Sequence, residues 1–152
     1  MEMQGEHIIP ADRQTVWAAL NNPDILRECI PGCEKLEMQS PTEMTATVVT
    51  KIGPVKAKFD GEVTLENLNP PESYTISGEG KGGIAGFAKG GADVKLEEVE
   101  GGTKLTYDVK AKVGGKLAQL GSRLIDSTAK KLAGQFFDNF SNTVGGDNAA
   151  TG

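Results

Sequence analysis

The longest amphipathic pattern in the chain lies at residues 116–144. Large apolar side chains recur there every three or four positions, and no proline interrupts them. This spacing predicts one long helix, Lys116–Val144, which at about 1.5 Å per residue would be roughly 40 Å long. A surface helix of that length needs an equally long partner surface. The apolar positions are Leu117, Leu120, Leu124, Ile125, Leu132, Phe136 and Phe140.

The middle of the chain has a two-residue period instead. After Gly53-Pro54, apolar or small residues at 55, 57, 59, 61, 63 and 65 alternate with polar or charged residues at 56–66. The same alternation recurs over 44–49, 74–78, 92–97 and 105–113, with a hairpin turn at Gly101-Gly102. Long strands with one apolar and one charged face are typical of an antiparallel sheet that is covered on one side only.

The N-terminal region adds a strand and two short helices. Met3–Ile9 reads as a strand ended by Pro10, residues 11–22 as a short helix, and residues 24–30 as a second helix that Pro23 opens. This order predicts an α+β fold, a curved antiparallel sheet wrapped around the long C-terminal helix. Residues 1–144 are expected to form a single domain, and 145–152 a disordered polar tail.

The apolar face of the predicted sheet is rich in small residues, among them Gly61, Gly78, Gly80, Ala88 and Ala92. Small inward residues beneath one helix leave volume unfilled, and a void at the low end of ligand pockets is about 300 Å³. Two interpretations remain open. Either the glycines allow the sheet to bend over a closed core, or a hydrophobic guest fills the space.

If a guest is enclosed, its contacts are expected on the inward rows of the strands and on one face of the helices. Tyr74, Tyr107 and Thr128 are the sparse polar groups that could orient it. The predicted lining residues are Trp17, Leu26, Met44, Phe59, Gly61, Tyr74, Ile76, Ala92, Tyr107, Leu124, Thr128 and Leu132.

Charge and composition narrow the function classes. The net charge is −5, which argues against a nucleic-acid partner. No run reaches the roughly 18 apolar residues that span a bilayer, and the N-terminus lacks the pattern of a signal peptide. A cytoplasmic protein is therefore expected. The two cysteines, Cys29 and Cys33, have neither redox-motif nor zinc-site spacing, so no metal and no cofactor are predicted.

Catalytic patterns are sparse. The single histidine, His7, has no nucleophile near it in sequence. Gly78, Gly80 and Gly83 satisfy G-x-G-x-x-G, but no helix pattern begins there, as a dinucleotide site requires. The carboxylates Glu62, Glu66, Asp93 and Glu97 fall on the charged outer face. We therefore expect a protein that is not an enzyme.

Three segments together carry a family resemblance. VWAALNNPDILRECIPGCEKLE at 16–37, KIGPVKAKFDGEV at 51–63 and GGKLAQLGSRLIDSTAKKLAGQFFDNF at 114–140 resemble the G-subunit family of carbon monoxide dehydrogenase, with IPGCE at 30–34 among the most specific parts. That family is part of the helix-grip superfamily, which includes START-like lipid-transfer domains and birch-pollen-allergen-like proteins.

The resemblance implies a seven-stranded sheet gripping the C-terminal helix around an apolar cavity. It also implies an accessory role beside a molybdenum-dependent carbon monoxide dehydrogenase or related redox enzyme, through a bound quinone or lipid or through peripheral contact with the inner face of the membrane. Two alternatives stay open. One is an enzyme like the polyketide cyclases and dehydratases of the superfamily, and the other is an interaction protein with a closed core.

Overall fold

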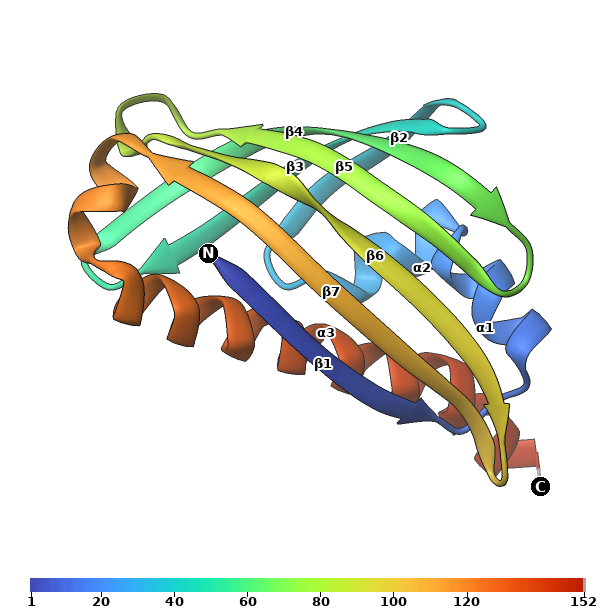
Figure 1. Cartoon of the computed structure of the whole chain (residues 1–152). Coiled ribbons are helices and arrows are strands. Elements are labelled where there is room, and N and C mark those ends of the chain that lie inside the picture. Colours follow the sequence, from blue (N-terminus) through green and yellow to red (C-terminus); the bar gives the residue numbers. More distant parts are fainter. Residues whose placement is uncertain (152) are drawn as a thin grey trace.

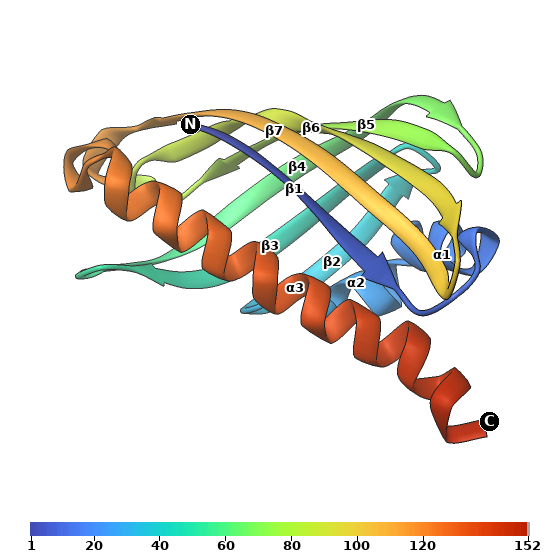
Figure 2. The same cartoon turned by 60° about the horizontal axis from the view of Figure 1, so that its bottom comes forward.

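A computed structural model describes the backbone of residues 1–151 and the side chains of residues 1–145. Seven antiparallel strands form one curved sheet in the order β1-β7-β6-β5-β4-β3-β2, and a long helix crosses its open side (Figures 1 and 2). The predicted α+β helix-grip fold is confirmed. In chain order the elements are β1 Glu2–Ile9, α1 Arg13–Leu20, α2 Pro23–Cys29, β2 Cys33–Ser40, β3 Glu43–Ile52, β4 Val55–Asn69, β5 Ser73–Lys81, the 3₁₀ turn η1 Gly83–Ala85, β6 Phe87–Val99, β7 Gly102–Gly114, the 3₁₀ turn η2 Gly115–Leu120 and α3 Ser122–Thr151.

The long strand β4 follows the alternation read from its sequence. From Val55 to Val63 the inward residues are half-buried, while the charged residues between them are exposed. Only at Leu65 does the inward row become fully buried. The sheet therefore has one charged face that is exposed to water and one apolar face. The apolar face is fully buried near Leu65 and only half-buried toward Val55.

Side-chain caps fix where the two short helices begin. The Asp12 side chain accepts a hydrogen bond from the backbone N–H of Thr15, at 2.7 Å, and so caps α1. Asn22 caps α2 in the same way through the N–H of Asp24, at 3.0 Å, and Pro23 occupies the first turn, where its missing N–H costs nothing. These caps explain why the chain turns twice between β1 and β2.

The long helix begins later than its apolar pattern predicts. Gly121 has a φ of 91°, in the left-handed region that ends a helix, so residues 115–120 form the separate turn η2 and α3 starts at Ser122. The start predicted at Lys116 is therefore wrong, although Leu117 is buried within η2. The helix extends to Thr151; the predicted disorder of residues 145–152 falls largely outside the residues whose side chains are described.

The hydrophobic core lies between the sheet and α3, at the end where α1 and α2 pack. Phe137, Phe140 and Val144, from the second half of α3, are buried there, whereas Leu124 and Leu132 of the first half are only half-buried. The backbone carbonyl of Cys29, at the end of α2, accepts a hydrogen bond from the Asn139 side chain at 3.0 Å, which ties α2 to α3. The first half of α3 thus covers a less tightly packed part of the sheet.

Candidate functional site: an apolar cavity between sheet and helix

A cavity of about 240 Å³ lies between the inward face of the sheet, α2 and the second half of α3. Strands β3 to β7 form its roof, and an aromatic pair of α3 forms its floor. Its walls are almost entirely hydrocarbon. The lining residues are Leu20, Leu26, Ile30, Met44, Val63, Leu65, Tyr74, Ile76, Val94, Leu105, Tyr107, Phe136 and Phe137.

Tyr74 brings the most deeply buried polar group to this cavity. The residue is 5% exposed, and its ring packs edge-on against Trp17 of α1, with centroids 5.2 Å apart. Burial alone raises the pKa of its hydroxyl, with no hydrogen bond contributing. The hydroxyl therefore stays protonated and keeps its capacity to donate a hydrogen bond.

A second polar position is formed where β1 meets α3. The His7 ring stacks on Phe137 with centroids 4.2 Å apart, and Tyr107 stacks on Phe137 at 5.4 Å. Gly5 lies opposite Tyr107 in the β1–β7 register, and a side chain there would collide with the tyrosine hydroxyl. The glycine thus leaves room for the Tyr107 ring at the cavity wall.

Five of the twelve predicted lining residues border the cavity, namely Leu26, Met44, Tyr74, Ile76 and Tyr107. Trp17 stands behind Tyr74. Phe59 lies against Gly82, toward the open end of the sheet. Gly61 and Ala92 instead border depressions that are lined largely by charged and polar side chains. These four lie outside the cavity.

The three predicted residues of α3 also lie outside it. Leu124, Thr128 and Leu132 are half-buried on the first half of the helix, and Leu124 approaches Gly53 at the β3–β4 turn. The cavity instead meets Phe136 and Phe137, roughly one to three and a half turns further along. Periodicity placed the apolar face of the helix correctly, but it could not show where along its length the helix meets the core.

The residues that sequence reasoning missed carried a usable signal. Val63 and Leu65 continue the alternating row that includes Phe59, and Leu105 precedes Tyr107 on the same face. Leu20 and Ile30 close the two short helices. A weighting toward large inward residues beside the short helices would have found them.

The small inward residues have a different role from the one the hollow-core interpretation gave them. Side chains at Gly78 or Gly90 would press on the backbone of a neighbouring strand, so these glycines allow close strand packing. Gly80 is the exception, because a methyl group there would meet no atom within 4 Å. Large residues, and not the glycines, line the cavity.

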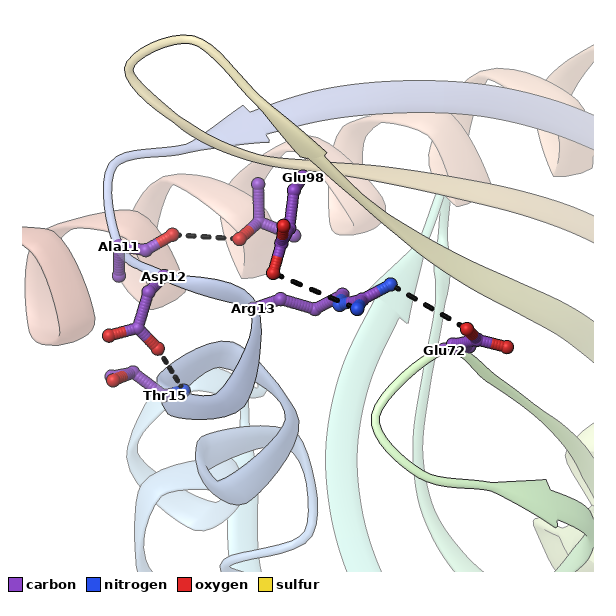
Figure 3. Close-up of polar contacts among 7 residues, drawn as sticks. Ala11, Asp12, Arg13, Thr15, Glu72 and Glu98 are labelled. Carbon is purple, nitrogen blue, oxygen red and sulfur yellow. Dashed lines mark hydrogen bonds and ion pairs between the residues drawn. The ribbon is translucent and has the colours of Figure 1, made fainter.

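Polar contacts join the start of α1 to the neighbouring strands of the sheet (Figure 3). The Arg13 guanidinium lies 4.0 Å from a carboxylate oxygen of Glu72 and 3.7 Å from one of Glu98, so it links α1 to two hairpins. The fully buried Thr103 hydroxyl donates to the carbonyl of Ala11 at 2.7 Å. These contacts hold α1 against the sheet.

Among the described residues that line the cavity none is a carboxylate, so acid and base groups do not converge there. Across the part of the chain with described side chains, no three His, Cys, Asp or Glu residues gather as metal ligands would. β5 leads into the three-residue turn η1, so the glycine-rich segment opens no phosphate-binding helix.

Burial raises the pKa of both the Cys29 and the Cys33 thiol, which disfavours their thiolates. No helix within residues 1–151 has the length and apolar character needed to cross a bilayer.

Solved structures share this architecture. A conserved protein from Geobacillus kaustophilus is 31% identical, with 95% of each chain covered and a TM-score of 0.89. A Chromobacterium violaceum protein has a TM-score of 0.71 at 12% identity, covering 95% of this chain and 97% of its own. A Thermus thermophilus protein has a TM-score of 0.72 at 15% identity over the whole of both chains. No curated protein matches the sequence.

The curved sheet, the gripped helix and the apolar space between them define a helix-grip protein of the START-like class. The family model of the carbon monoxide dehydrogenase G subunit (CoxG) matches residues 5–145. The chain belongs to that family.

Proposed function

We propose that this protein encloses part of a hydrophobic small molecule, a quinone or a lipid, in the cavity beneath the sheet, without transforming it. The observation that carries the proposal is the cavity itself. It holds about 240 Å³ of apolar space, and Tyr74 is the more deeply buried of the two tyrosines in its lining. A guest with an acceptor oxygen within reach of that hydroxyl would gain one hydrogen bond, worth about 0.5–1.5 kcal/mol.

The size of the cavity limits how such a guest would sit. Ligand pockets usually begin near 300 Å³, so 240 Å³ suits a ring system or a short acyl segment. A longer tail would leave toward the open end, where the inward residues of β4 and the first half of α3 are only half-buried. At the α1 end, by contrast, Leu20, Leu26 and Leu65 of the lining are buried.

Family membership supports a role for this binding beside a redox enzyme. The family is named for a subunit of carbon monoxide dehydrogenase. The role proposed for this chain is that of an accessory protein or carrier for a molybdenum-dependent enzyme of that kind or a related redox enzyme. In that role the protein would work on the cytoplasmic side, with peripheral contact at the inner face of the membrane. The role requires guest exchange and no chemistry, in keeping with a lining that lacks a carboxylate.

The enzymatic alternative has one supporting contact and lacks a second. His7 does face inward and stacks on Phe137, a cavity residue. An acid–base mechanism needs a paired group within reach, and no carboxylate lines the cavity. The closed-core alternative requires dense contact between helix and sheet where the structure has the cavity.

The experiment is a titration of the purified protein with a menaquinone analogue, followed by tyrosine and tryptophan fluorescence. Trp17 packs against Tyr74, so occupation of the cavity should change the emission. Val63→Phe fills the cavity and is expected to abolish binding. Val55→Phe, on the same face of the same strand but outside the cavity, is the matched control. Absence of saturable binding at tens of micromolar, together with no co-purifying lipid by mass spectrometry, would refute the proposal.

A further inference from the structure

The loop between β5 and β6 exposes the most prominent hydrophobic side chain of the described residues. Ile84 in η1 is 91% exposed, and Phe87, which starts β6, is 41% exposed. Figure 1 shows this loop beside η2, at the end of the sheet away from α1 and α2. One exposed apolar side chain would need no explanation, but Ile84 and Phe87 are both exposed within four residues of one loop, and grouped apolar side chains rimmed by polar residues are typical of an interaction site.

The loop is held firmly enough to present Ile84 outward. The next residue, Ala85, is buried, as is Leu117 of the adjoining η2. The Gly82 N–H donates to the Gly86 carbonyl at 2.8 Å and closes the loop. Gly86, at φ 113°, lies so close to Gly114 that any side chain there would collide with it. The backbone thus fixes Ala85 inward and Ile84 outward.

Charge is sharply divided between the two ends of the molecule. Segments 51–58, 79–89 and 110–116, around the exposed loop, carry eight lysines and one acidic residue, Glu79. The turns at the opposite end, 40–43, 66–72 and 97–104, carry six glutamates and one lysine. Two of the lysines are paired, Lys58 with Glu34 at 3.2 Å and Lys81 with Glu79 at 3.7 Å, and the others are available to a partner. This basic end contrasts with a net charge of −5.

We infer that the basic tip, defined as Ile84, Phe87, Lys89, Lys112 and Lys116, docks on an anionic lipid surface. Lysines near such a surface are attracted by its negative potential, and apolar side chains that reach the acyl boundary add to the binding. The glutamate-rich end would be repelled, so the molecule stands end-on. Its half-buried, open end then faces the bilayer, the source of a hydrophobic guest.

The inference deepens the peripheral membrane contact of the proposed function, but it does not require the cavity to bind a guest. Co-sedimentation with vesicles lacking any quinone therefore tests it separately. The wild type is expected to bind vesicles of phosphatidylcholine mixed with phosphatidylglycerol, and to leave pure phosphatidylcholine vesicles in the supernatant. Binding should weaken severalfold when salt shortens the Debye length from about 8 Å at 0.15 M to about 3 Å at 1 M.

Matched variants locate the contact. Ile84→Glu is expected to lower partition onto the anionic vesicles about tenfold or more, because the apolar contact is lost and a repulsive charge is added. Ile8→Glu is the control, since Ile8 is 57% exposed on β1, at the α1 end. Both sites are exposed, so circular dichroism should report intact folds. Equal binding of the wild type and Ile84→Glu, or no binding of the wild type to anionic vesicles, overturns the inference. Unchanged menaquinone titration of Ile84→Glu would show that docking and guest binding are separate properties.

Discussion

His7 of β1 and Phe137 of α3 stack with ring centroids 4.2 Å apart and an interplanar angle of 21°. The contact joins the edge strand at the N-terminus to the helix near the C-terminus, at the wall of the apolar cavity. Among the described residues, no strand pairs with the outer edge of β1, which is bonded to β7 on its other side. The stack therefore secures the edge of the grip.

Removing this stack should loosen β1. His7→Ala is expected to lower the free energy of unfolding by about 1 kcal/mol, the range of an aromatic pair, whereas His7→Phe should retain most of it. Urea denaturation followed by circular dichroism measures both. Equal stability of the alanine variant and the wild type would show that the stack contributes nothing.

Gly32 in the IPGC segment should tolerate no side chain. Its φ is 78°, and a methyl group there would collide with the Val49 carbonyl. Gly32→Ala is expected to destabilise by at least about 1–2 kcal/mol, from the left-handed conformation alone. Gly80→Ala is the matched control, since a methyl group there meets nothing within 4 Å. Thermal unfolding of the two variants should separate them clearly, and similar midpoints would contradict the argument.

The Thr103 hydroxyl should be essential to the α1 end of the grip. Thr103→Val keeps the shape but leaves the buried Ala11 carbonyl without its donor, and it should cost about 1–3 kcal/mol. Thr64→Val, on the exposed face of β4, changes the same atoms in water and should be nearly neutral. Chemical denaturation that finds both variants equally stable would rule out a role for the hydrogen bond.

A substitution at Tyr74 should affect guest affinity without lowering the stability of the fold. Tyr74→Phe keeps the buried ring and removes only the hydroxyl, whose pKa no protein hydrogen bond shifts, so the empty protein should be no less stable. Binding of a carbonyl-bearing guest should weaken about two- to tenfold, the value of one hydrogen bond. The menaquinone titration measures the second effect. Unchanged affinity would mean that the hydroxyl does not contact the guest.

The Asp12 cap should make the stability of the protein depend on pH in the acidic range. The hydrogen bond from the Thr15 N–H lowers the pKa of its carboxyl below the ordinary 3.8. A lowered pKa in the folded state means that the stabilisation is complete above the ordinary value and is lost as the pH falls through the folded pKa. Asp12→Asn keeps an acceptor that does not titrate, so its thermal midpoint should fall less between neutral and strongly acidic pH. Parallel pH profiles for the two proteins would contradict this.

Much of the fold could be predicted because its signals are local. Alternation over β4 and the three- to four-residue period of α3 depend only on which face of each element is buried. Gly121 shows the limit. Its positive φ delays the start of α3 to Ser122, although a glycine at that position is compatible with a helix that begins earlier.

The amino-acid sequence alone determined the element order, the dry face of the sheet, the gripped helix and the family. The tertiary structure decided where the hollow lies. Curvature of the sheet brings Tyr74 and Met44 over Phe136, while Gly61 and Ala92 border the outer surface. Periodicity records which face of an element is buried, but the position along a strand at which two layers meet or separate depends on the crossing of sheet and helix. That crossing is set by contacts between residues far apart in the chain, such as His7 and Phe137.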